Sequence, residues 1–182
     1  MRRSLQHCTL IACLLLAPAA ASAQRVPTTD SGAIGGDVGV FLPSSDELDT
    51  SLALEGFYEY YFTPRGSVRL GLGWTDPSFT RGSDDHLRTI RIAVDGVYNW
   101  EGGVVHPFVG AGLGIYFLQP TDNGESVQDS ETKTGGTLFG GIEFFTGRTT
   151  SIKAEAKYHL VADAFGLEPD GFALMIGLKK YF

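Results

Sequence analysis

Apolar and polar residues alternate with a period of two from Gly32 to Phe182, and this alternation restricts the chain to β-structure. Eight segments carry the pattern, at 32–42, 51–62, 67–75, 86–100, 105–118, 135–146, 151–162 and 171–182. Three connections are tight turns, at 63–66, 101–104 and 147–150, and four are longer and acidic, at 43–50, 76–85, 119–134 and 163–170. Because short and long connections alternate, we expect antiparallel hairpins in an up-and-down meander. The even number of strands places both termini of the chain at the short-turn end.

The two faces of these segments differ in charge. One face is apolar, and its only charges are Arg88 and Lys180, both near strand ends. The other face carries six acids and five bases, namely Asp37, Glu55, Glu59, Asp95, Glu143, Glu155, Arg69, Arg91, Lys153, Lys157 and Lys179. It also carries glycines that we expect to make room for long Arg and Lys side chains, at Gly71, Gly73, Gly110, Gly112, Gly114, Gly141 and Gly177. Large aromatic residues share this face, among them Phe57, Tyr61, Phe108, Tyr116 and Phe139.

Two kinds of closed barrel use such an alternation. A soluble barrel of the lipocalin type places the apolar face inside, whereas a membrane barrel places it against lipid. The near balance of acids and bases favours a mutually paired interior, and segments near 9–11 residues suit a tilted membrane crossing. Aromatic residues also cluster at both ends of the apolar face, with Tyr60, Phe62, Tyr98, Trp100, Phe144 and Phe182 near the short turns and Trp74, Phe117 and Phe172 near the long loops. We therefore predict an all-β fold, an eight-stranded antiparallel up-and-down transmembrane β-barrel.

The first residues match a signal for export. A positive start at Arg2 and Arg3 precedes the apolar stretch 10–17, and Ala21 and Ala23 form a small-x-small cleavage pattern before Gln24. We predict a cleaved signal peptide at 1–23 and a single β-barrel domain at 24–182. Lipoprotein processing at Cys13 is the alternative. The formal net charge of −7 and the absence of a basic stripe exclude a general polyanion binder, so no nucleic-acid partner is expected.

Three segments carry a resemblance to a known family. Residues 106–114 (HPFVGAGLG), 151–158 (SIKAEAKY) and 177–182 (GLKKYF) resemble the fifth strand, the seventh strand and the C-terminal assembly signal of small OmpA/OmpX-type outer-membrane barrels of Gram-negative bacteria. The resemblance implies a cell outer membrane location after export through the periplasm, and a monomer. It also implies contact with outer-membrane lipids and lipopolysaccharide, and with the barrel assembly machinery through the strand ending at Phe182. Lys180 departs from the apolar or aromatic residue common two positions before the terminal Phe.

No motif specifies chemistry. The glycines at Gly110, Gly112 and Gly114 lie inside a strand and open no helix, unlike a dinucleotide loop. The histidines at His86, His106 and His159 have no metal-ligand spacing. Carboxylate pairs such as Glu55 and Glu59 share a face with arginines, which favours structural ion pairs over acid–base catalysis. We therefore predict no catalytic residue, no cofactor and no metal site.

The function is expected to be structural or surface-interacting rather than enzymatic, with acidic extracellular loops. The loop acids form either a solvated crown or a surface that bridges to lipopolysaccharide through divalent cations. A narrow porin-like channel is one alternative, and a lipid A-modifying enzyme is another. Outer-membrane lipid A deacylases, which are also eight-stranded barrels, need a Ser two residues after the His base. The candidate His159 is followed by Val161, which has no hydroxyl and cannot attack an ester.

Overall fold

The computed structural model describes residues 27–80, 85–100, 103–122, 125–126, 129–166 and 168–182, and the predicted signal peptide lies outside these ranges. Nine strands follow one another along the chain: β1 (Ser31–Pro43), β2 (Ser51–Tyr61), β3 (Gly66–Thr75), β4 (Asp85–Asn99), β5 (Val105–Asp122), β6 (Glu125–Ser126), β7 (Glu131–Phe145), β8 (Thr150–Val161) and β9 (Gly171–Tyr181). No helix in the described part of the chain is long and apolar enough to span a membrane.

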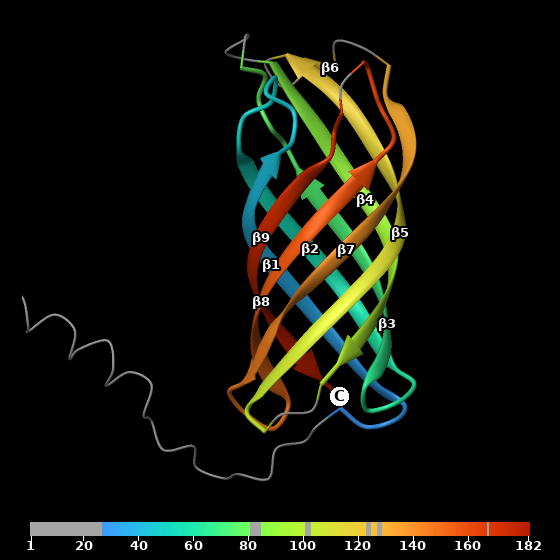
Figure 1. Ribbon diagram of the computed structural model, residues 1–182, viewed down its shortest axis with the longest axis vertical. Helices are drawn as coiled ribbons and strands as arrows, with labels where there is room; N and C mark the ends of the chain where they lie inside the picture. Colours follow the sequence, from blue (N-terminus) through green and yellow to red (C-terminus); the bar gives the residue numbers. More distant parts are fainter. Residues whose placement is uncertain (1–26, 81–84, 101–102, 123–124, 127–128, 167) are drawn as a thin grey trace, which may run out of the picture.

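The eight long strands close into a barrel whose strands wind obliquely around its axis (Figure 1). Each long strand pairs antiparallel with its neighbours in the chain, and β1 pairs with β9 from Ala33 opposite Tyr181 to Pro43 opposite Gly171. The short turns and the chain's C-terminus lie together at one end, the short-turn end, and the four longer loops lie at the other, the long-loop end (Figure 1). The predicted fold class and the predicted alternation of connections are confirmed.

Strands β5 and β7 extend well beyond their predicted bounds at the long-loop end, β5 to Asp122 and β7 from Glu131. The pairing of β5 with β7 continues to Leu118 opposite Glu131, and the pairing of β4 with β5 continues to Asp85 opposite Asp122. The two-residue β6, which was not predicted, folds back on the end of β5. At this end the hairpin rises beyond the apolar band. Because side chains there no longer alternate between an apolar and a polar surrounding, the sequence gives no period-two signal.

The burial of the two faces is that of a membrane barrel. The predicted lipid-facing residues are exposed, with Leu113 at 76%, Ile176 at 64% and Leu138 at 63%. The charged residues of the other face are buried, and all eleven expose 6% or less of their surface. The predicted aromatic residues of the short-turn end are all exposed, and at the long-loop end Phe117 and Phe172 are exposed while Trp74 is half-buried. The inside-out arrangement excludes the soluble lipocalin type, because a soluble chain would bury the apolar face.

Apolar clusters close the interior at both ends. At the short-turn end, Tyr61, Phe145 and Tyr181 pack around Ala33. At the long-loop end, the cluster consists of Leu48, Leu87, Tyr116, Leu118, Val161 and Ala164. Leu48 and Ala164 come from the connections themselves. These two loops are therefore not only a solvated crown, because part of each packs into the mouth of the barrel.

Candidate functional site

The centre of the barrel is an ion-pair network built around Glu155 of β8. Its carboxylate lies 2.8 Å from Arg69 Nη1, 2.8 Å from Lys153 Nζ and 3.1 Å from Lys157 Nζ. Arg69 and Lys157 have no exposed side-chain surface. Each of these groups is costly to remove from water alone, and the close opposite charges offset that cost.

The network extends toward both ends of the barrel. Toward the long loops, Lys157 Nζ and Arg91 Nη2 lie 2.7 and 2.6 Å from Glu55 Oε2. Toward the short turns, Arg69 Nε and Lys179 Nζ both lie 3.1 Å from Glu59 Oε2. Lys179 Nζ also donates to Glu143 Oε2 at 3.0 Å. The predicted paired interior is therefore confirmed, and it forms one connected network rather than separate pairs.

Three glycines allow interior side chains to reach across an intervening strand. Lys153, Gly177 and Asp37 form one row over β8, β9 and β1, and Lys153 Nζ lies 2.8 Å from Asp37 Oδ2 across the glycine. In the same way, Arg91 reaches Glu55 across Gly73. A third row places Gly112 between Asp95 and Thr137, and the Thr137 hydroxyl donates to Asp95 Oδ1 at 2.8 Å. Two of these glycines thus make room for a long basic side chain, as predicted.

Other interior glycines make room for rings instead. A Cβ at Gly110 would lie 2.2 Å from the Phe139 ring, and one at Gly141 would lie 2.7 Å from the Phe108 ring. These rings in turn contact a cation, because the Arg69 guanidinium lies 5.1 Å from the centroid of Phe139 and 5.7 Å from that of Phe108. The expectation for Gly110 and Gly141 was therefore wrong. A β-strand pattern shows which residues face inward but not which of them lie opposite each other.

Three carboxylates converge at the centre of the barrel. Single carboxylate oxygens of Asp37, Glu55 and Glu155 lie within 4.8 Å of one another, a grouping that sequence analysis missed because it depends on the register across three strands. Lys153 and Lys157 lie between these carboxylates at ion-pair distance. The ammonium groups take the place a cation would occupy, so these residues do not fit a resident metal.

His159 and His106 lie toward opposite ends of the barrel. His159 Nδ1 lies 3.1 Å from Tyr116 Oη inside the barrel, and its ring packs edge-on against Phe41. Val161, at the position of a deacylase nucleophile, is buried in the cluster at the long-loop end. His106 lies near the opposite end, where its Nε2 is 3.0 Å from the Gly103 carbonyl. The inward direction of His159, away from lipid, agrees with its parity in the strand.

The long-loop end presents acidic side chains on a hydrogen-bonded platform. The first two loops are joined by Asp49 N donating to Ser78 O at 2.8 Å and Thr80 N donating to Glu47 O at 2.9 Å. Exposed acids among the described residues here are Asp46, Glu47, Asp49, Asp85, Asp129, Asp163 and Glu168. Within the described ranges, none of them belongs to a group of three or more close acidic or His ligand atoms. The structure does not describe the side chains of four further charged residues at this end, Arg81, Asp84, Asp122 and Glu125.

An apolar outer band, a paired charged interior and eight closed strands define a transmembrane β-barrel. The chain matches the outer membrane protein beta-barrel domain family over residues 9–179, and it belongs to that family. It is an outer-membrane protein, as the sequence predicted.

Solved structures show the same fold at low sequence identity. Neisserial surface protein A is 14% identical with a TM-score of 0.68, over 84% of this chain and 97% of that one. OprG from Pseudomonas aeruginosa is 14% identical with a TM-score of 0.64, over 87% and 99%. Ail, the attachment invasion locus protein of Yersinia pestis, is 17% identical with a TM-score of 0.58, over 86% and 100%. No curated protein matches the chain.

Proposed function

We propose that this protein is a non-enzymatic structural barrel of the outer membrane that meets its surroundings through an acidic extracellular platform. The observation that carries the proposal is the connected ion network, whose buried side chains occupy the middle of the barrel. Apolar clusters lie above and below it. A barrel filled in this way is a rigid carrier for its loops, because every interior contact restrains the strands.

The alternative of a narrow channel is disfavoured by the same packing. The cavity in the long-loop half, between the network and the loop cluster, measures about 40 Å³ and is lined by Arg91, Tyr116 and His159 among others. That volume suits a few waters at most. Conduction of ions would require the network between Glu55 and Glu143 to separate, and breaking buried pairs costs about 3–5 kcal/mol each.

The charge of the loops supports a cation-dependent rather than a direct contact with lipopolysaccharide. Both surfaces are anionic, so they repel unless divalent cations bridge them. Ail was also solved with the heparin analogue sucrose octasulfate. The exposed acids of the present loops would repel such a sulfated ligand. The carboxylates here are dispersed, which suits diffuse bridging to many phosphates rather than one chelated ion.

Planar-bilayer recordings and a lipid assay test the proposal together. The refolded protein should give no stepwise conductance, and it should release no fatty acid from lipopolysaccharide by mass spectrometry. Stable conductance steps would replace the structural role with a channel. Fatty acid release by the wild type that disappears in His159→Ala would show that the protein is an enzyme. For the surface role, binding of the barrel to lipopolysaccharide should require Mg²⁺ or Ca²⁺, and equal binding in EDTA would contradict cation bridging.

A further inference from the structure

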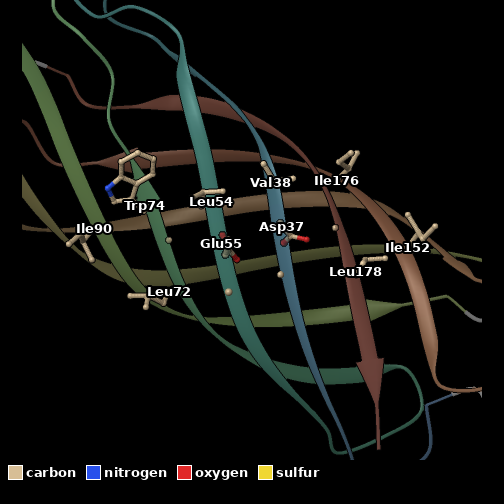
Figure 2. A pocket seen from close by; sticks show the side chains of 14 residues that line it. Asp37, Val38, Leu54, Glu55, Leu72, Trp74, Ile90, Ile152, Ile176 and Leu178 are labelled. Atoms are coloured by element: carbon tan, nitrogen blue, oxygen red, sulfur yellow. The ribbon is translucent and has the colours of Figure 1, made fainter.

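The apolar outer surface contains a groove where two glycines lie side by side. Gly36 of β1 is paired with Gly56 of β2, and Leu178 and Leu72 continue the row on β9 and β3. All four positions face outward, so the middle of the row has no side chains. The resulting glycine groove has a volume of about 800 Å³ and is lined by Gly36 and Gly56 among others. The side chains of Val38, Leu54, Ile176 and Leu178 also line it (Figure 2).

A cation lies just beyond one end of this groove. Lys180 follows Leu178 on the same face of β9, two residues nearer the short-turn end, and it is exposed. Its ammonium donates to Thr149 Oγ1 at 2.8 Å. None of the ion pairs between described residues includes Lys180. A charged side chain on the lipid-facing surface is favourable only near the interface, where it can meet water or an anionic headgroup.

The order of these features along the barrel matches an amphiphile. The Lys180 ammonium lies at the membrane interface, and the glycine groove leads from it toward the bilayer centre. We propose that Lys180 and the glycine groove together bind one glycerophospholipid of the leaflet at the short-turn end. Its phosphate contacts the Lys180 ammonium and the Thr149 hydroxyl, and one acyl chain lies over Gly36 and Gly56.

A second copy of the chain fits this surface less well. A two-fold dimer through the groove would bring two Lys180 side chains toward the same interface, and like charges repel there. A phospholipid instead supplies the opposite charge and a flexible chain that can follow a shallow groove. The inference is independent of the proposed function, since it concerns the outer wall and not the loops.

The groove can be filled without disturbing the wall. A Cβ at Gly56 has no neighbour within 4 Å, so Gly56→Leu should fold and occupy the groove. Lys180→Gln removes the charge alone. Two controls match these changes. Gly136→Leu adds the same side chain on the lipid-facing side outside the groove, where the nearest atom to a Cβ is Gly112 O at 3.6 Å. Arg88→Gln removes the other lipid-facing charge, at the long-loop end.

Native mass spectrometry of the detergent-solubilised protein, titrated with phosphatidylglycerol, measures the binding. The wild type should retain one lipid, and Gly56→Leu should lose it. Lys180→Gln should bind about fivefold more weakly, the effect of one basic side chain near an anionic membrane surface. Diacylglycerol, which lacks phosphate, should bind the wild type as weakly as phosphatidylglycerol binds Lys180→Gln.

The controls decide between a specific site and general adhesion of lipid. Gly136→Leu and Arg88→Gln should retain phosphatidylglycerol like the wild type. Equal retention by wild type, Gly56→Leu and Lys180→Gln would overturn the proposal, and so would an equal loss in Arg88→Gln. If Gly56→Leu does not show the electrophoretic shift of a folded barrel, Gly36→Ala takes its place, because the nearest atom to its Cβ is 3.6 Å away. Detection of the wild type as a dimer without bound lipid in the same spectra would also overturn the proposal.

Discussion

Removing the charge of Glu155 tests whether the interior network is desolvated and cooperative. Glu155→Gln keeps the size and the hydrogen-bonding capacity of the side chain but leaves Arg69, Lys153 and Lys157 with one carboxylate fewer. Glu155 lies within 3.1 Å of all three cations, and its side chain has no exposed surface. Breaking a buried pair by removing one partner costs about 3–5 kcal/mol, because an uncompensated charge remains inside. We expect a loss of that size in the free energy of unfolding.

Urea titration of the barrel in lipid vesicles measures the loss, and Glu131→Gln is its matched control. Glu131 pairs with Lys133 at the same 2.8 Å distance, but their side chains are 36% and 29% exposed. Solvent screens that pair, so its removal should cost at most about 1 kcal/mol. Equal, small losses for Glu155→Gln and Glu131→Gln would refute the idea that the interior is dry.

Three further predictions concern the wall of the barrel and its orientation. Val94→Arg, in the middle of β4, should cost about 2–4 kcal/mol in vesicles, whereas Leu52→Arg, near the long loops, should cost clearly less; equal unfolding free energies would contradict the depth assignment. Gly177→Ala should destabilise the barrel by about 1–3 kcal/mol through overpacking, while Gly56→Ala should be neutral. The physical reason is that a Cβ at Gly177 would lie 1.8 Å from Asp37 Oδ1, whereas one at Gly56 meets nothing within 4 Å. A cysteine at Ser126 should react with an impermeant maleimide on intact cells, and one at Thr149 only after the outer membrane is opened; the reverse pattern would invert the topology.

The fold could be predicted because the membrane imposes the same rule on every strand. Each crossing needs an apolar outer face, so residues such as Ile92, Val94 and Leu113 repeat the signal many times over. The same alternation identified Arg69 and Lys157 as interior residues. Periodicity specifies the face of a residue but not its height along the barrel, which depends on the register between strands. For this reason the convergence of Asp37 with Glu155, and the bridging over Gly177, required the structure.

The apolar cluster at the long-loop end could not be predicted from the period-two alternation, for a different reason. Leu48 and Ala164 are isolated apolar residues in acidic segments, and a single residue has no period. Their burial follows from the width of the barrel mouth, which leaves Leu87 and Leu118 uncovered unless the loops fold inward. The glycine groove was hidden for a similar reason, because Gly36 and Gly56 are ordinary strand glycines until the register places them together.

Some acids of the network lie at the opposite end of the chain from its lysines, and this affects the order in which the barrel assembles. The carboxylates of Asp37, Glu55 and Glu59 lie on the first two strands, and the ammonium groups of Lys153, Lys157 and Lys179 lie on the last two. Arg91 and Arg69 can meet Glu55 and Glu59 within the first four strands. The three lysines, by contrast, reach Asp37, Glu55 and Glu59 only when β1 pairs with β9. Until then Asp37 remains hydrated, since its ion-pair partner Lys153 lies on β8 and drying it alone is costly. We therefore expect Asp37 to lose its water only as the seam closes, so that a nascent sheet without its last two strands keeps a hydrated carboxylate at its open edge.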